Sequence, residues 1–216
     1  IKVVILSGNG KAFCAGHDIT QMNSARTSAD GGKSYFQDLF ARCTAVMTGL
    51  QKLPQVVIAQ VHGIATAAGC QLVASSDLAV AAEDTKFGVN GVNIGLFCST
   101  PMVALSRNIP RKHALELLTT GNFMTATRAA ELGLINHAVP IAQLEAETLL
   151  LATTIADKLG TAVKIGKQAF YQQLQMPLDQ AYAFTSEVIV ENLLHRDTIE
   201  GMNAFAEKRQ PNWKND

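Results

Sequence analysis

The chain has 216 residues, of which 48% are hydrophobic and 17% are charged. A chain of this size and composition can bury a large core and fits one domain, with or without an appendage. Lys plus Arg and Asp plus Glu are balanced at 18 each. This balance removes the usual electrostatic argument for nucleic acid or an anionic membrane surface as the main partner.

The first two thirds of the chain read as strands separated by turns and helices. β-branched or apolar runs at residues 2–7, 56–61 and 78–82 predict three strands. Residues 32–53 carry apolar side chains at a period near 3.6, which predicts a helix between the first two. This alternation favours an α/β fold with parallel strand pairing and right-handed crossovers.

After Phe97 the pattern becomes helical. We predict a core over residues 1–140, whose N-terminal part is incomplete because the chain begins directly on a strand, and a helical region over 141–216. A brief strand is expected at 135–139. The expected helices are one capped by Ser99 or Thr100, one from Pro110 to Gly121, one from Thr125 to Gly133, and four at 144–159, 163–174, 178–194 and 197–208.

The four cysteines are Cys14, Cys43, Cys70 and Cys98, and their spacing matches no zinc-site template. We interpret them as reduced, mostly buried thiols, which suits a reducing compartment. The most apolar stretch, residues 56–82, is interrupted by polar and charged side chains, which argues against a membrane-spanning helix. We expect the natural N-terminus, and any targeting segment, to lie upstream of residue 1.

Two segments rich in glycine and alanine follow the first two predicted strands, at 11–19 and 62–72. Small residues let a ligand approach the backbone, and the second segment runs into an apolar helix whose first N–H groups are free. Such donors suit an oxyanion. Close packing of a strand against a helix selects glycine and alanine equally well. Gly8-Asn9-Gly10-Lys11 lacks the other glycines of the nucleotide-binding motifs and is interpreted as a turn.

At these segments the sequence resembles the crotonase (enoyl-CoA hydratase/isomerase) superfamily, and within it the enoyl-CoA hydratase domain-containing group. The resemblance covers nearly the whole chain. It implies the ClpP-like crotonase fold of repeated ββα units, with a C-terminal helical region that mediates trimerisation. The segments that carry it are KAFCAGHDI at 11–19, HGIATAAGCQLVASSDLAVAAEDTKFG at 62–88, ATRAAELGLINHAVP at 126–140 and GMNAFAEKRQPNW at 201–213.

The resemblance implies that the chain binds an acyl-CoA thioester. The oxyanion hole would be formed by the backbone N–H groups of His17 and Ala68. The residues that would contact the CoA moiety or substrate are Ala15, His17, Asp18, Ile19, Phe205 and Lys208, the last two often from a neighbouring subunit. No metal and no cofactor beyond the coenzyme A of the substrate is implied.

Two departures from the family pattern concern its catalytic glutamates. Gln71 stands where one is usual, and Gly91 aligns with the other. Glutamine does not exchange a proton at neutral pH, and glycine has no side chain. General acid–base catalysis supplies about 10²–10⁴-fold per group, so at most weak hydratase activity is expected. Replacing both residues by glutamate should raise that activity on an intact scaffold.

Other side chains are candidate substitutes for the glutamates. The His17 imidazole is suited to acid–base chemistry near pH 7, although a structural or CoA-contacting role is the stronger interpretation. Asp18 and Asp77 are interpreted as structural, and Cys98 as buried rather than nucleophilic. Asn90 and Asn93 flank the Gly91 position, where they can hydrogen-bond a water molecule.

Three functional hypotheses follow. The first is an enoyl-CoA hydratase/isomerase-like enzyme, a lyase or isomerase of fatty acid metabolism. The second is a non-catalytic acyl-CoA-binding or regulatory protein. The third, an RNA-associated protein on the same fold, is disfavoured by the charge balance. The family resemblance also implies a homotrimer or a dimer of trimers, in the cytoplasm of a bacterium or the mitochondrial matrix of a eukaryote.

Overall fold

The computed structural model describes residues 1–214 and divides the chain into two compact units. We call Ile5–Gln51 and Val57–Leu149 the core unit. Ile1–Val4, Lys52–Val56 and the described residues from Leu150 form the C-terminal unit. The domain boundary predicted after residue 140 stays a prediction, because a compact unit is a group of contacts and not a demonstrated folding domain.

The main sheet confirms the predicted α/β class with parallel pairing. β2 pairs with β4 in parallel, with Ile58 opposite Leu78, and β4 pairs in parallel with β7, with Val80 opposite His137. Most of β2 and β4 is buried, as expected for strands of a parallel sheet covered on both faces. The strands, in the order β1-β2-β4-β7, are β1 Val3–Ser7, β2 Val56–Val61, β4 Leu78–Ala82 and β7 His137–Val139.

A second, smaller sheet was not predicted from the sequence. It contains β3 (Ile64–Thr66), β5 (Lys86–Gly88) and β6 (Phe123–Thr125), with β3 parallel and β6 antiparallel to β5. Each strand has only three residues, which is too short for an alternating pattern to stand out in a sequence. This sheet fixes the segment that runs from β3 into the helix after it.

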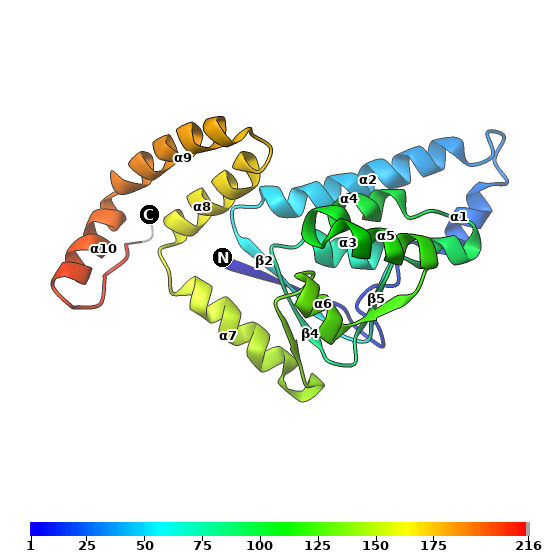
Figure 1. Ribbon diagram of the computed structural model, residues 1–216, viewed down its shortest axis with the longest axis horizontal. Coiled ribbons are helices and arrows are strands. Elements are labelled where there is room, and N and C mark those ends of the chain that lie inside the picture. The colour runs from blue at the N-terminus through cyan, green and yellow to red at the C-terminus, as the bar shows by residue number, and fades with distance from the viewer. Residues whose placement is uncertain (215–216) are drawn as a thin grey trace. The chain divides into compact units, whose positions relative to one another are not determined.

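Five α-helices lie wholly within the core unit, and a sixth, α2, lies within it except for its last residue, Lys52. α3, α4 and α5 pack successively against one another (Figure 1). Gly121 and Gly133 end α5 and α6 in left-handed conformations, and Thr125 caps α6, as predicted. The prediction that Ser99 or Thr100 caps α4 is wrong. Ser99 is the first helical residue, and Cys98 holds the cap position without a side-chain hydrogen bond. The helices are α1 Ile19–Ala25, α2 Lys33–Lys52, α3 Ala68–Ser75, α4 Ser99–Asn108, α5 Arg111–Thr120 and α6 Ala126–Leu132, with two 3-10 turns, η1 Asn90–Ile94 and η2 Ile141–Gln143.

The remaining helices are α7 (Leu144–Ala156), α8 (Gly160–Gln173), α9 (Leu178–Leu193) and α10 (Arg196–Ala206). α7 begins in the core unit and ends in the C-terminal unit, where α8 and α9 lie side by side (Figure 1). These helices confirm the predicted helical character of the last third. Among the described residues, none of the helices has the length and apolarity needed to cross a membrane.

Candidate functional site

The two predicted glycine-bearing segments lie next to each other in the core unit. The Cys14 N–H donates to the Ile64 carbonyl at 3.2 Å, and the Thr66 N–H donates to the Cys14 carbonyl at 3.0 Å. A Cβ atom on Gly69 would lie 2.0 Å from the Cys14 carbonyl oxygen. Glycine is therefore required at position 69, because the backbones of the two segments approach more closely than any side chain permits.

The turn into α3 has a strained backbone at Ala67. Its φ of 50° and ψ of −118° lie in a region that residues other than glycine rarely adopt. The Ala67 N–H donates to the Gly88 carbonyl at 3.0 Å, which fixes the turn from the β5 side. Since ψ of Ala67 sets the orientation of the next peptide, this turn determines where the Ala68 N–H points.

Backbone donors at this junction that have no acceptor within the part of the chain that the structure describes include the N–H groups of His17, in the first segment, and of Ala68, the first residue of α3. Ala68 is at a helix N-terminus, where unpaired N–H groups and the helix dipole favour negative charge. The two residues predicted to form an oxyanion hole thus both retain free donors.

Both residues line a cavity of about 480 Å³ whose other walls are mainly apolar. Of the other predicted site residues, Ala15, Ile19 and Gly91 line it too, whereas Gln71 and Asp18 do not. No Asp, Glu, Lys or Arg is among the lining residues. The apolar walls include Met22, Phe40, Ile94, Leu96, Phe97 and Pro101. The cavity suits an uncharged, largely apolar group.

The His17 ring is one polar feature of this cavity. It meets Phe40 edge to face, with ring centroids 5.4 Å apart and an interplanar angle of 89°. Nε2 is buried and has no hydrogen-bond partner. Burial lowers the pKa of His17 below its ordinary value of 6.5. The imidazole is therefore neutral at pH 7.

Thr66 and Asn90 form a second polar feature. The Thr66 hydroxyl donates to Asn90 Oδ1 at 2.8 Å and also lies 3.2 Å from the Gly88 carbonyl oxygen. Asn93 instead donates from Nδ2 to the Gly121 carbonyl at 3.3 Å, which ties η1 to the end of α5. Both asparagines line the cavity, as expected for residues that flank Gly91.

Gln71 is 5% exposed and points toward α2, where the Cys43 thiol lies 3.9 Å from its Oε1. Asp18 accepts from the N–H groups of Thr20 and Gln21 at 2.8 and 3.2 Å and so caps α1. This geometry fits the structural interpretation of Asp18. Similarly, Asp77 accepts from the Val57 N–H at 2.7 Å at the entrance to β4.

Gly91 lies inside a tight turn. A Cβ atom at this position would lie 2.2 Å from the Leu96 carbonyl oxygen and 2.9 Å from the Cys98 thiol. The Leu96 N–H also donates to the Gly91 carbonyl at 2.9 Å. A glutamate therefore cannot occupy position 91 unless the turn opens. That Gly91 aligns with a catalytic glutamate of the family stays a prediction, but the turn explains why a side chain is excluded here.

The cysteines of the core unit are all free, and Cys43, Cys70 and Cys98 are buried, as predicted. Burial raises the pKa of the Cys70 thiol to about 12, so this thiol is inert as a nucleophile at neutral pH. Cys98 lines the cavity beside Gly91.

No cluster of three or more His, Cys, Asp or Glu side chains suited to a metal ion occurs among residues 1–214.

Phe205 and Lys208 belong to the C-terminal unit. Phe205 is 88% exposed on α10, and Lys208 follows the helix with a left-handed φ of 55°. The chain turns back there, because Arg209 pairs with both carboxylate oxygens of Glu200 at 2.7 and 2.9 Å. The CoA-binding role of Phe205 and Lys208 stays a prediction.

The fold and the complete match to one family now define the class of protein. The model of the enoyl-CoA hydratase/isomerase family matches residues 1–216, and the chain belongs to this family, within the crotonase superfamily. The structure accordingly has the α/β crotonase fold that the sequence predicted.

Relatives at the level of individual proteins are similar over nearly all of the chain. Mitochondrial enoyl-CoA hydratase domain-containing protein 3 of Xenopus laevis is 46% identical over 213 residues, which are 99% of this chain and 71% of the relative. The human protein of that name is 45% identical over 216 residues, which are 100% of this chain and 70% of the human protein. A crystal structure of an enoyl-CoA hydratase of Mycobacterium smegmatis superimposes with a TM-score of 0.94 at 49% identity. The superposition covers 98% of this chain and 80% of that structure.

Proposed function

We propose that the chain binds an acyl-CoA thioester in this cavity and polarises the thioester carbonyl with the backbone N–H groups of His17 and Ala68. The observation that carries the proposal is the pair of free donors, from two different segments, at the wall of an apolar cavity. Both donors are fixed before a ligand arrives, so an enolate-like oxygen gains more from them than a neutral carbonyl does. One such donor is typically worth about 2.7–4 kcal/mol.

The remaining parts of the thioester have their own places in this proposal. The acyl chain occupies the apolar part of the cavity, bounded by Leu96, Phe97 and Pro101. The CoA moiety follows Ala15, Asp18 and Ile19 outward. Its nucleotide contacts the Phe205 and Lys208 positions of a neighbouring subunit, as the family resemblance implies. The proposal includes no cofactor other than the coenzyme A of the substrate.

The reaction supported best is an isomerase-like or other thioester reaction that proceeds through an enolate, rather than standard hydration of an enoyl-CoA. The alternative is a non-catalytic acyl-CoA-binding or regulatory protein, which the lack of a lining carboxylate favours. Hydration of crotonyl-CoA, measured as loss of its enoyl absorbance, distinguishes a standard hydratase from an enolate-forming enzyme and from a non-catalytic binder.

Assembly and location are also part of the proposal. Exposed apolar side chains on α9 and α10 support association into a homotrimer or a dimer of trimers, as the family resemblance implies. The relatives from Xenopus laevis and human are named mitochondrial. We propose the mitochondrial matrix if the chain is eukaryotic and the cytoplasm if it is bacterial.

The decisive experiment compares two ligands that differ in one oxygen atom. Butyryl-CoA carries the thioester carbonyl, and S-butyl-CoA is the thioether that lacks it. Titration calorimetry should give a dissociation constant at least about tenfold lower for butyryl-CoA, a difference of about 1.4 kcal/mol. Equal affinities would remove the oxyanion hole from the proposal, and no binding of either ligand would remove the acyl-CoA assignment.

A pair of variants locates the binding site. Phe97→Asp places a carboxylate in the apolar wall and should weaken butyryl-CoA binding by at least about tenfold, because the ligand must then desolvate a charge. Leu115→Asp on α5 is the control, since Leu115 is 57% exposed and does not line the cavity. Equal weakening in both variants would show that the acyl chain lies elsewhere.

A further inference from the structure

The His17 side chain has no hydrogen bond to any residue that the structure describes. Nε2 is buried without a hydrogen-bond partner, and Nδ1 has no partner among the described residues either. Buried polar atoms are almost always paired, and an exception calls for an explanation. A structural histidine would be expected to have its ring nitrogens satisfied. Because Nε2 is fully buried while the ring lines the cavity, the side chain must turn for this nitrogen to find its partner in a ligand.

The surroundings of His17 keep its ring neutral. α1 carries no charged residue, and the cavity wall has no Asp, Glu, Lys or Arg. The carboxylate of the neighbouring Asp18 caps α1. On α2, Asp38 and Arg42 pair with each other at 2.7 Å and are mostly exposed. Cys98 is the other titratable side chain of the wall. A neutral imidazole with an unshared electron pair is a base at pH 7.

The position of His17 along the chain also matters. Its own backbone N–H is one of the free donors at the cavity wall. In the proposed complex, the thioester oxygen accepts from that N–H, and Cα of the acyl chain, the carbon next to the carbonyl, lies near the side chain of the same residue. Acid strength at Cα rises when the neighbouring carbonyl oxygen is hydrogen-bonded, because the enolate is stabilised.

We infer that the His17 imidazole is the base that removes a proton from Cα of the bound acyl-CoA, which makes His17 a catalytic residue through its side chain as well as its backbone. In this step the Cα–H bond breaks and a ring N–H bond forms. The electron pair moves into the enolate, whose oxygen is held by the N–H groups of His17 and Ala68. Return of a proton from the ring to Cα restores the thioester. The inference rests on the proposed function.

In heavy water this step has a signature that needs no further chemistry. The ring exchanges its proton with the solvent, so return to Cα delivers deuterium. Butyryl-CoA, which has no double bond and cannot be hydrated, should therefore lose its Cα protons in the presence of the protein. Proton NMR and mass spectrometry measure this exchange directly, and a sample without protein gives the background.

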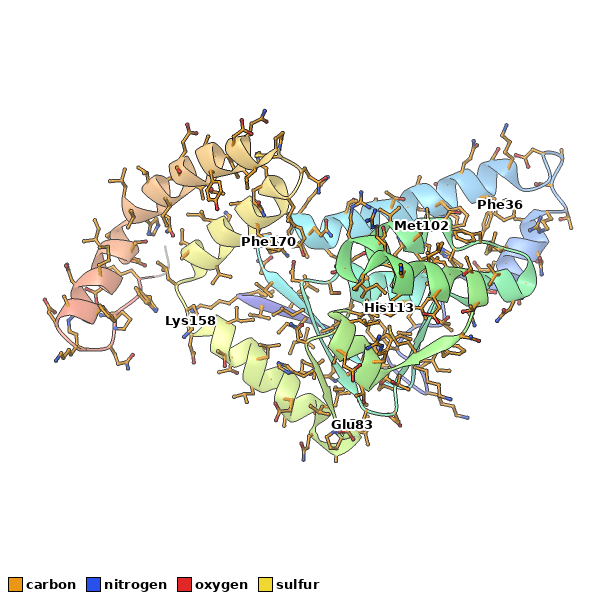
Figure 2. The ribbon with its side chains drawn as sticks, in the orientation of Figure 1. Phe36, Glu83, Met102, His113, Lys158 and Phe170 are labelled. Carbon is orange, nitrogen blue, oxygen red and sulfur yellow. The ribbon has the colours of Figure 1, made fainter. Side chains whose placement is uncertain are left out.

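The test compares the wild-type protein with His17→Phe, which keeps a ring against Phe40 but removes both nitrogens. The exchange rate should fall by about 10²-fold or more, while the dissociation constant of butyryl-CoA changes less than about threefold. His113→Phe is the matched control. His113 lies on α5, as labelled in Figure 2, and does not line the cavity, so its replacement should leave the exchange rate unchanged.

The wild-type pH profile supplies a test that needs no variant. Only the neutral ring accepts a proton, and burial lowers the pKa of His17 below 6.5. Exchange above background should therefore stay level from about pH 7 to about pH 6.5 and fall at lower pH. A rate that does not fall down to about pH 5 would contradict the inference.

The outcomes separate the inference from the proposed function. Binding of butyryl-CoA without exchange, or full exchange by His17→Phe, overturns the role of the imidazole and leaves acyl-CoA binding intact. No binding by the wild-type protein overturns both. Binding with exchange that depends on His17 and on a neutral ring supports both.

Discussion

At the scale of single residues, the strained Ala67 turn is the feature with the clearest energetic consequence. A residue other than glycine in a sparsely populated φ/ψ region costs of the order of 1–3 kcal/mol. The surrounding contacts maintain the strain, because the Ala67 N–H is held by Gly88 and its carbonyl accepts from the Gln71 N–H at 3.1 Å. Strain stored at this position orients the Ala68 donor.

Ala67→Gly should therefore stabilise the protein by about 1 kcal/mol, because relief of the strain exceeds the additional entropy that glycine gives the unfolded chain. Urea denaturation measures the change. Ala65→Gly is the matched control two residues earlier, since Ala65 is fully buried in β3. It should destabilise by about 0.5–1 kcal/mol or more. A loss of stability in both variants would show that the Ala67 methyl group packs usefully and that strain is minor.

At the scale of elements, the turn formed by η1 and Leu96–Cys98 decides what chemistry position 91 can support. Gly91 faces the Leu96 carbonyl, so Gly91→Ala should destabilise by roughly 1–3 kcal/mol. Gly49→Ala in α2 is the control, because a Cβ there would meet nothing within 4 Å. It should stabilise by about 0.8–1 kcal/mol through helix propensity. Equal effects at the two glycines would mean that the turn adapts easily.

This turn also revises the expectation for the variant with glutamate at positions 71 and 91. The new carboxylate at 91 would displace the turn, and the one at 71 would replace a 5% exposed amide that faces Cys43. The double variant therefore does not rebuild an acid–base pair in the existing cavity. A rise in crotonyl-CoA hydration with unchanged stability would contradict this view of the turn.

The elements that the sequence predicted well are those whose signals are local. Gly121 and Gly133 end helices because a left-handed residue is needed there, and the β-branched run at Val56–Val61 forms a buried strand. None of these features requires knowledge of distant contacts. The oxyanion role of His17 and Ala68, which the family resemblance implies, stays a prediction.

The features that could not be predicted depend on packing between distant segments. The three-residue strands β3, β5 and β6 form only by pairing with distant segments: β5 with β3 and β6, and β3 with Cys14 as well. The direction of the Gln71 side chain is set by α2, and the constraint on Gly91 by the fold of Leu96 over it. Several residues singled out from the sequence line the cavity, but tertiary structure decides which side chains reach it.

At the scale of the whole molecule, the open question is how the exposed apolar side chains of α9 are covered. Leu178, Tyr182, Ile189 and Leu193 recur at intervals of four, seven and four residues, which places them along one face of the helix. All four are between 44% and 75% exposed. A row of this kind on a protein in water marks an interaction surface.

If this row is buried between copies of the chain, as the proposed trimer requires, charges in it should break the assembly. Tyr182→Asp with Ile189→Asp should convert a mass of three or six chains into that of one chain in light scattering coupled to size-exclusion chromatography. The reason is that the free energy needed to desolvate two carboxylates exceeds the free energy gained from the remaining apolar contacts. Gln180→Asp, which adds one charge at an exposed position of the same helix, should leave the mass unchanged. An unchanged mass for the double variant would show that the subunits contact each other through another surface, and the row on α9 would then bind a different partner.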